Sequence, residues 1–268
     1  MPVCSFCQEI QISNSARTAG LGGCSISISD SWSVINNQAG LGSQRSYWAG
    51  IYHENKYLVK ELGYSVLAAC IPVKPGTFGI SLTHFGYSQY SQSRFALSYG
   101  MKLSSNIYAG VGLNYHTLKL ANEYGSASCI SVEGGIIYNP IEKLTLGAHI
   151  INPTQSTFGS SKKLPTSFGL SLAYKPNRNI ILIVQGDDNT QYKTVFRTGI
   201  EYNPIKRVSI RTGIASNPTE VSFGLGWRVK HMVFDLAFSY HQILGYTPFA
   251  SLSYTFSDSA KSQDKTIQ

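Results

Sequence analysis

From about residue 44 onward, apolar and polar residues alternate in segments of about ten residues, which is the weak repeating pattern of a transmembrane β-barrel. In the segment 106–115, Ile107 and Leu113 share one face, and Asn106 and Asn114 share the other. Successive side chains of a strand point to opposite faces of its sheet. The alternation therefore predicts strands with one apolar and one polar face.

Fourteen such segments follow one another along the chain. They lie near 44–53, 60–72, 76–86, 92–103, 106–119, 127–139, 143–151, 165–175, 179–186, 191–203, 206–216, 219–229, 231–241 and 247–256. Tight turns, such as 139–140 and 203–204, alternate with mostly longer connections, such as 152–164. An even strand number with short turns at one end is typical of a single-chain bacterial barrel. We therefore predict an all-β fold, a fourteen-stranded antiparallel transmembrane β-barrel over residues 44–256.

Aromatic residues separate a membrane barrel from a soluble β-sandwich. Six strands carry one on the apolar face near the tight-turn end: Tyr99, Tyr138, Tyr174, Tyr202, Trp227 and Tyr254. Tyr115, Tyr192 and Tyr240 fall near the opposite end. Two such belts are expected where amphipathic rings lie at the two membrane–water interfaces. Lipid of an outer membrane is therefore an expected partner.

Composition supports this prediction and excludes others. Only 13% of residues are charged, and the longest apolar runs, 66–71 and 180–184, fall far short of the ~20 residues of a membrane-spanning helix. The net charge of +8 suggests nucleic acid, but the basic residues sit at turns rather than in a stripe with stacking aromatics. Water or lipid headgroups explain these turn charges better, so we expect no nucleic-acid partner.

The polar face is rich in Gly, Ser and Ala, with charges dispersed among them. We expect these charges to form a network in the lumen: Arg94, Glu133, Arg197, Glu201, Arg211, Glu220, Arg228 and Asp235. Small residues on an inner wall leave space, and residues 8–43, which lack strand alternation, are the obvious filler. Within them Asp30 is a plausible helix N-cap. It is also expected near a lumen arginine such as Arg197 or Arg211, because an unpaired buried charge is costly.

This filler segment carries the one family resemblance. It reads Ser15-Ala-Arg-Thr-Ala-Gly-Leu-Gly-Gly23 and later Asn36-Asn-Gln-Ala-Gly-Leu41. In that order the two stretches resemble the hatch of the FadL-like outer-membrane superfamily, and most nearly its PorV/PorQ-type members of the type IX secretion system. The matching residues are Ala16, Arg17, Gly20, Gly22, Gly23, Asp30, Asn36, Asn37 and Gly40. Gln38 departs from the family, which usually has proline there, and the outer loops are short.

The resemblance implies a plugged barrel in the outer membrane of a Gram-negative bacterium of the Bacteroidetes type. Such a barrel serves either as a scaffold in protein secretion and surface attachment or as a channel for hydrophobic solutes. We prefer a PorV/PorQ-like secretion component, with secretion-system or cell-surface proteins as partners. A FadL-type channel that takes up a hydrophobic ligand is the alternative. A channel should show a continuous apolar pocket beside the hatch and a kinked strand that opens laterally. A scaffold should show a sealed polar lumen and an exposed apolar patch for a partner.

The two ends of the chain are expected to lie outside the barrel. Residues 1–7 look like the remnant of a signal peptide cleaved before Gln8, with the true start codon upstream. Cys4 and Cys7 form a C-x-x-C, but no second pair or histidine follows at zinc-ligand spacing. The polar residues 257–268 are expected to be a disordered tail.

Enzymatic chemistry finds no support in the sequence. His84, His116, His149 and His241 fall on four different strands, and neither G-x-S-x-G nor H-E-x-x-H occurs. We therefore assign no catalytic residues, no metal site and no cofactor.

Overall fold

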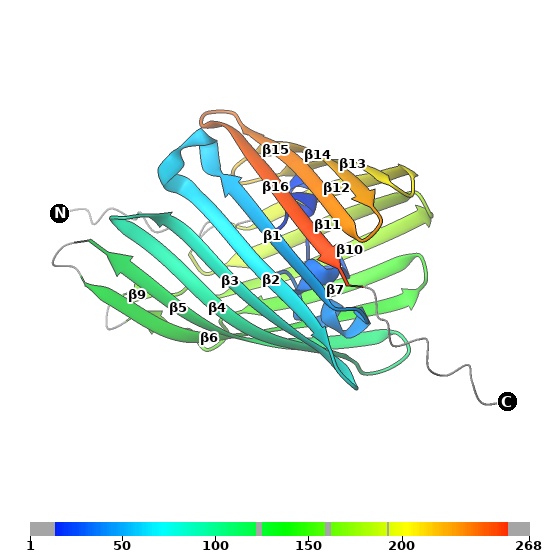
Figure 1. The fold of residues 1–268 in the computed structure, drawn as a ribbon, viewed down its shortest axis with the longest axis horizontal. Coiled ribbons are helices and arrows are strands. Elements are labelled where there is room, and N and C mark those ends of the chain that lie inside the picture. The colour runs from blue at the N-terminus through cyan, green and yellow to red at the C-terminus, as the bar shows by residue number, and fades with distance from the viewer. Residues whose placement is uncertain (1–13, 122–124, 159–161, 192, 257–268) are drawn as a thin grey trace.

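The computed structural model describes residues 14–121, 125–158, 162–191 and 193–256, and its dominant feature is a closed antiparallel barrel of fourteen strands (Figure 1). The strands are β1 (Trp48–Asn55), β2 (Gly63–Pro72), β3 (Gly76–Tyr87), β4 (Tyr90–Lys102), β5 (Ile107–Leu120), β6 (Ser126–Ile141), β7 (Leu144–Ile151), β10 (Ser167–Asn177), β11 (Ile180–Asn189), β12 (Val195–Ile205), β13 (Val208–Ala215), β14 (Glu220–Val229), β15 (Met232–His241) and β16 (Gly245–Thr255). Each strand pairs with its neighbours around the barrel, and β1 closes the circle by pairing with β16. The predicted fold class is confirmed.

The apolar faces of the strands form the outside of the barrel. In one row, Ile80, Leu97 and Leu113 are direct neighbours on β3, β4 and β5, and Leu97 and Leu113 are exposed. One residue further along β4, Ser98 points inward and is buried. A soluble barrel would turn its apolar face inward. This barrel has the reverse pattern, as the alternation predicts.

The two ends of the barrel differ in their connections. At one end, called here the tight-turn end, neighbouring strands are joined by two to four residues, at 73–75, 103–106, 142–143, 178–179, 206–207 and 230–231. At the other, the loop end, the β1–β2 connection holds two short 3-10 helices, η3 (Lys56–Leu58) and η4 (Lys60–Leu62). The β7–β10 connection holds a small hairpin of β8 (Thr157–Phe158) and β9 (Lys162–Lys163).

Residues 14–43, called here the N-terminal segment, fold into three short helices inside the barrel (blue in Figure 1). They are α1 (Ala16–Gly20) and the 3-10 helices η1 (Ser31–Val34) and η2 (Gln38–Ser43). Each begins after a side-chain cap, from Ser15, Asp30 and Asn37 respectively. These caps satisfy backbone N–H groups that would otherwise lack partners. None of the helices in the described ranges is long and apolar enough to cross a bilayer.

One difference from the sequence expectation concerns the boundary of the first strand. The first strand begins at Trp48 rather than near residue 44, because η2 continues to Ser43 and Trp48 points inward. There Trp48 meets Trp32 of η1 edge-on, with ring centroids 4.9 Å apart. The expected signal remnant 1–7, the first residues of the expected filler and the expected tail 257–268 lie outside the described residues.

Candidate functional site

The N-terminal segment is hydrogen-bonded to the barrel wall on opposite sides. The carboxamide oxygen of Gln185 on β11 accepts from the backbone N–H groups of Ser25 and Ile26, at 2.9 and 3.1 Å. On β14 the Ser222 hydroxyl accepts from the Gly22 N–H at 3.0 Å. On β3 the Thr77 hydroxyl donates to a carbonyl just beyond the segment, that of Gln44, at 3.0 Å. Backbone groups without strand partners are thus satisfied by the inner wall.

Glycine allows the segment to approach that wall closely. Gly22 has a φ of +68°, and a Cβ placed on it would lie 2.8 Å from the backbone N of Ile214. A Cβ on Gly20 would lie 2.9 Å from the Cα of Gly224. Any larger residue would push α1 away from β13 and β14. The matching glycines of the family motif are therefore explained by contact with the wall.

The largest charge cluster joins the segment to the wall through Arg17. Its Nε donates to Glu201 of β12 at 2.9 Å, and its Nη1 donates to Asp30 at 3.0 Å. Glu201 also accepts from Arg211 at 2.7 Å, and Arg211 donates to Asp235 at 2.6 Å. Burial opposes the charge of Arg17, but Glu201 and Asp30 outweigh it and raise the pKa of Arg17 above its ordinary value. The cluster alternates cations and anions from one residue to the next.

Asp30 caps η1 as expected, accepting from the Trp32 N–H at 3.0 Å. Its ion-pair partner differs from the sequence expectation. Asp30 binds Arg17 of its own segment, and Glu201 then connects Arg17 to the lumen residue Arg211. Arg17 is the member of this cluster whose role the sequence did not indicate.

Two further polar clusters hold the segment. The Gln38 amide donates to Glu133 of β6 at 2.7 Å, and its oxygen lies 3.0 Å from Nε2 of His149 on β7. Proline, which the family usually has at this position, could make neither contact. On the other side Arg197 donates to Asp187 at 2.9 Å and to the carbonyl of Gly22 at 2.8 Å.

The expected single lumen network is therefore divided into these clusters. Within the described ranges, Arg94 and Glu220 form no ion pair and line a cavity instead. The assignment of Arg228 to the lumen network is wrong, because Arg228 is exposed at the tight-turn end of β14, beyond the lumen. Alternation assigned it to the inner face, but the strand ends one residue later, where solvent is accessible.

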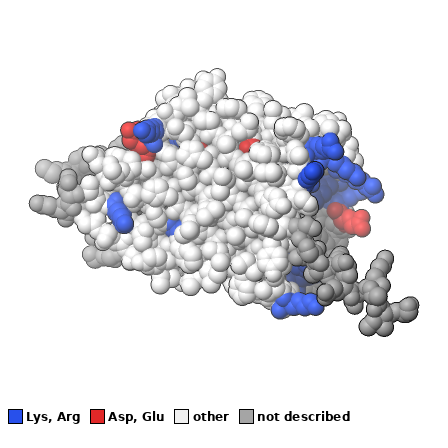
Figure 2. Space-filling view, in the orientation of Figure 1, with Lys and Arg blue, Asp and Glu red and all other residues white. Residues whose placement is uncertain are grey.

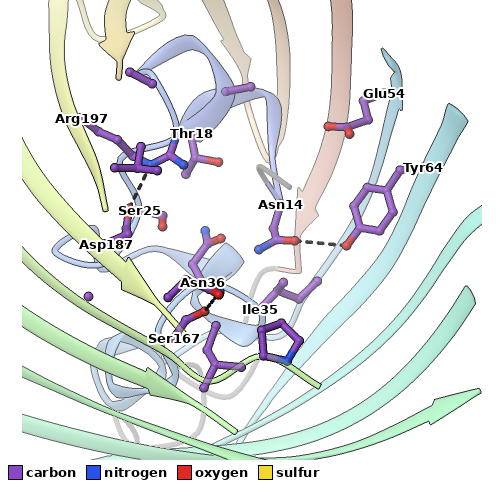
Figure 3. Close-up of a pocket in the computed structure, with 18 of the residues that line it drawn as sticks. Asn14, Thr18, Ser25, Ile35, Asn36, Glu54, Tyr64, Ser167, Asp187 and Arg197 are labelled. Atoms are coloured by element: carbon purple, nitrogen blue, oxygen red, sulfur yellow. Dashed lines mark hydrogen bonds and ion pairs between the residues drawn. The ribbon is translucent and has the colours of Figure 1, made fainter. Parts of the chain in front are cut away.

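A cavity of about 360 Å³ lies between the N-terminal segment and the loop end of the barrel (Figure 3). Part of its lining comes from the segment, including Thr18, Ile35 and Asn36, and the rest comes from strands and loop-end connections. Strand residues near the loop end, such as Glu54 of β1, line the walls.

Two buried amides that line the cavity lack hydrogen-bond partners. Asn36 is 4% exposed and Asn114 is 1% exposed, and neither amide nitrogen nor amide oxygen has a hydrogen-bond partner among the described residues. Arg94 of β4 lies directly across from His116 of β5, two residues from Asn114. Buried polar groups are normally hydrogen-bonded, so four orphaned amide atoms indicate a missing partner such as water or a ligand.

Apolar side chains also line the cavity. Ile35 and Phe85 are among them, and so are Phe158 of β8 and Leu164, which are 6% and 7% exposed. Phe158 meets the ring of His116 edge-on at 6.3 Å. Phe158 and Leu164 of the β7–β10 connection thus pack in one apolar cluster with Leu118 of β5 and Cys129 of β6. Sequence analysis missed the β8–β9 hairpin, because a two-residue strand has no measurable alternation.

The histidines form hydrogen bonds on separate strands. His116 lies 2.9 Å from the Ser131 hydroxyl, and the exposed His84 lies 3.0 Å from that of Ser93. Within the part of the chain that the structure describes, no three His, Cys, Asp or Glu residues are grouped to hold a metal ion. The described free cysteines, Cys24, Cys70 and Cys129, are all buried.

Neither a family model nor a curated protein sequence matches this chain. Solved structures do. The Ralstonia pickettii toluene transporter TbuX matches with a TM-score of 0.74 at 12% identity, over 91% of this chain and 98% of that chain. The P. putida toluene transporter TodX gives 0.68 at 13% identity over 90% and 98%, and a Pseudomonas aeruginosa FadL homologue gives 0.64 at 14% over 89% and 97%. The chain therefore shares its fold with these three proteins.

Proposed function

We propose that the protein is a FadL-type outer-membrane channel for small hydrophobic molecules that carry a polar head. The observation that carries the proposal is the cavity beside the N-terminal segment, which is lined both by apolar side chains and by two buried amides without partners. A hydrocarbon body would bury against Ile35, Phe85 and Phe158. A carboxylate or hydroxyl head would give Asn36, Asn114 and Arg94 the partners that they lack.

The outer surface supports a membrane location. Apolar side chains cover the outside of the closed barrel, and the aromatic residues Tyr138 and Trp227 are 42% and 60% exposed near its tight-turn end. Closure leaves no unpaired strand edge, which a lipid environment requires. In bacterial barrels the short turns face the periplasm, so the cavity would open toward the outside of the cell.

The secretion scaffold preferred from the sequence receives less support. A sealed polar lumen was expected of a scaffold, and the loop-end half of this lumen instead contains a cavity lined in part by apolar side chains. The transporters TbuX and TodX also favour the channel, as proteins of the same fold. The lateral opening expected of a channel is not present in this conformation, because hydrogen-bonded pairing runs around the whole barrel.

In this proposal the N-terminal segment is the hatch of the channel, and the structure is its closed state. The segment fills the tight-turn half of the lumen and reaches the wall through Arg17, Gln38 and Gly22. A ligand in the cavity would contact Asn36 of the segment directly. Passage would then require the segment to move, because it lies between the cavity and the tight-turn end.

Equilibrium binding of radiolabelled octanoate and of toluene tests the polar-head requirement. The full chain would be reconstituted in nanodiscs, with empty nanodiscs as the background. We expect octanoate to bind, and Asn114→Leu to weaken that binding at least about tenfold through loss of a buried hydrogen-bonding group. The matched control is Arg228→Gln, which removes an arginine outside the cavity and should leave binding unchanged.

Three results bear on different parts of the proposal. Toluene binding equal to that of octanoate, unaffected by Asn114→Leu, would refute the polar head and keep the channel. Absence of binding by either probe would refute the channel. Recovery of a specific bound protein from the outer membrane, together with that absence, would favour the secretion scaffold.

A further inference from the structure

The tight-turn end of the barrel carries a ring of positive charge. Ten exposed Lys and Arg side chains form it: Arg45, Lys74, Lys102, Lys143, Lys175, Arg178, Lys206, Arg207, Arg228 and Lys230. Every one of the tight turns contributes at least one member, either within the turn or next to it, so the ring continues around the barrel. Figure 2 shows Lys and Arg gathered at the end where β16 finishes.

Little negative charge offsets this ring. Glu142 is the one exposed acidic residue at the tight-turn end within the described ranges. None of the ten basic side chains forms an ion pair there. The loop end is closer to balance, with exposed Lys60, Lys119, Lys163 and Lys193 set against exposed Glu61 and Asp188. The large excess of exposed positive charge is therefore found at the tight-turn end.

The ring lies immediately beyond the outward-facing aromatic residues of the same end. Tyr174 is followed directly by Lys175, and Trp227 by Arg228, while Tyr202 precedes Lys206 by four residues. Exposed aromatic rings of a barrel lie at headgroup level. Long basic side chains one to four residues further out reach the phosphate groups of the same leaflet.

We propose that this basic ring binds the headgroups of anionic phospholipids in the leaflet at the tight-turn end. A ring of unpaired cations at a membrane surface attracts anionic lipids over a distance of about one Debye length. An acidic protein would need a contiguous patch with specific pairing, whereas these cations are spread around the entire circumference. A continuous shell of lipid is the partner that this geometry fits.

Electron paramagnetic resonance of spin-labelled lipids tests the proposal. The full chain would be reconstituted in phosphatidylcholine vesicles containing trace spin-labelled phosphatidylglycerol or phosphatidylcholine, and the motionally restricted fraction of each label gives their relative association with the barrel. We expect phosphatidylglycerol to associate about threefold more strongly at low salt, and this preference to fall toward one in 0.5 M NaCl, where the Debye length is below about 5 Å.

Two variants test whether the basic ring causes the preference for phosphatidylglycerol. The variant K175Q/R178Q/K206Q/R207Q/K230Q should reduce the preference for phosphatidylglycerol to nearly one. The control K60Q/K119Q/K163Q/K193Q, at the loop end, should keep the wild-type preference. A wild-type ratio of one, or an equal loss in both variants, would overturn the proposal. Neither result depends on whether the cavity binds octanoate.

Discussion

At the scale of single residues, Arg17 is the side chain that joins the N-terminal segment to the largest charge cluster of the lumen. It forms ion pairs with Asp30 of its own segment and with Glu201 of the wall, and Glu201 also forms an ion pair with Arg211. A buried ion pair contributes little net stability when intact, but removing one partner leaves an uncompensated charge. The residues of this cluster should therefore differ widely in their sensitivity to substitution.

Replacing Arg17 with methionine should destabilise the barrel by about 3 kcal/mol or more, because Glu201 and Asp30 both lose a cation. Asp30→Asn should cost less than about 1 kcal/mol, since Arg17 keeps Glu201 and asparagine is an equally good N-cap. Urea unfolding in vesicles, followed by tryptophan fluorescence, gives both free energies. Equal losses in the two variants would show that Arg17 does not organise the cluster.

The thiol of Cys24 reports whether the N-terminal segment stays in place. Cys24 is fully buried, and burial raises its pKa to about 12. Because the thiolate is the reactive form, alkylation of folded C4S/C7S/C70S/C129S protein by iodoacetamide at pH 8 should be at least about 100-fold slower than that of a free cysteine. The rate should stay low as the pH rises and increase only as it approaches 12.

The same measurement tests movement of the segment. Urea-unfolded protein, in which Cys24 is accessible, is the control and should react at the rate of a free thiol. Fast labelling of the folded variant at pH 8 would mean that the segment leaves the lumen spontaneously.

At the scale of elements, the fourteen strands could be predicted because a period of two, weak in any one segment, recurs in fourteen consecutive segments. The β8–β9 hairpin escaped prediction because its strands have two residues each. The contacts of the N-terminal segment escaped for a different reason. Arg17 and Glu201 are 184 residues apart in sequence, and only barrel closure brings them together. The orphaned amides of Asn36 and Asn114 likewise depend on that closure.

η2 provides a prediction at this scale. Proline at its first position fits the backbone of a helix start, so Gln38→Pro restores the pattern of the family without strain. The substitution nevertheless removes the donor to Glu133 and the contact with His149, and should cost about 1 to 3 kcal/mol. Thermal denaturation of the vesicle-embedded protein measures the loss, with the half-buried Gln44→Ala as the control. An unchanged melting temperature would mean that another group satisfies Glu133.

At the scale of the whole molecule, barrel and segment act as one body, since the segment is bonded to β14 on one side and to β6 on the other. The proposed channel therefore depends on breaking several of these contacts together. Ser27 and Ser171 of β10 offer a place to test this, because their hydroxyl oxygens lie 2.8 Å apart.

The double variant S27C/S171C, in a background without other cysteines, should form a disulfide that locks the segment to the wall. Octanoate uptake into proteoliposomes should fall to background when the disulfide is oxidised and return after reduction. Both single variants serve as controls for the loss of the serine hydroxyls. Uptake through the oxidised protein at the wild-type rate would mean that solutes pass a stationary segment.

The seam between β1 and β16 has a consequence for assembly. β1 begins four residues after the N-terminal segment ends, and it is also the strand that completes the circle. The segment must consequently enter the forming barrel before β1 pairs with β16, since no gap between strands remains for it afterwards. Insertion into the membrane and installation of the plug are then a single event, and a barrel that closes too early would trap Glu201 and Glu133 without the partners that the segment brings.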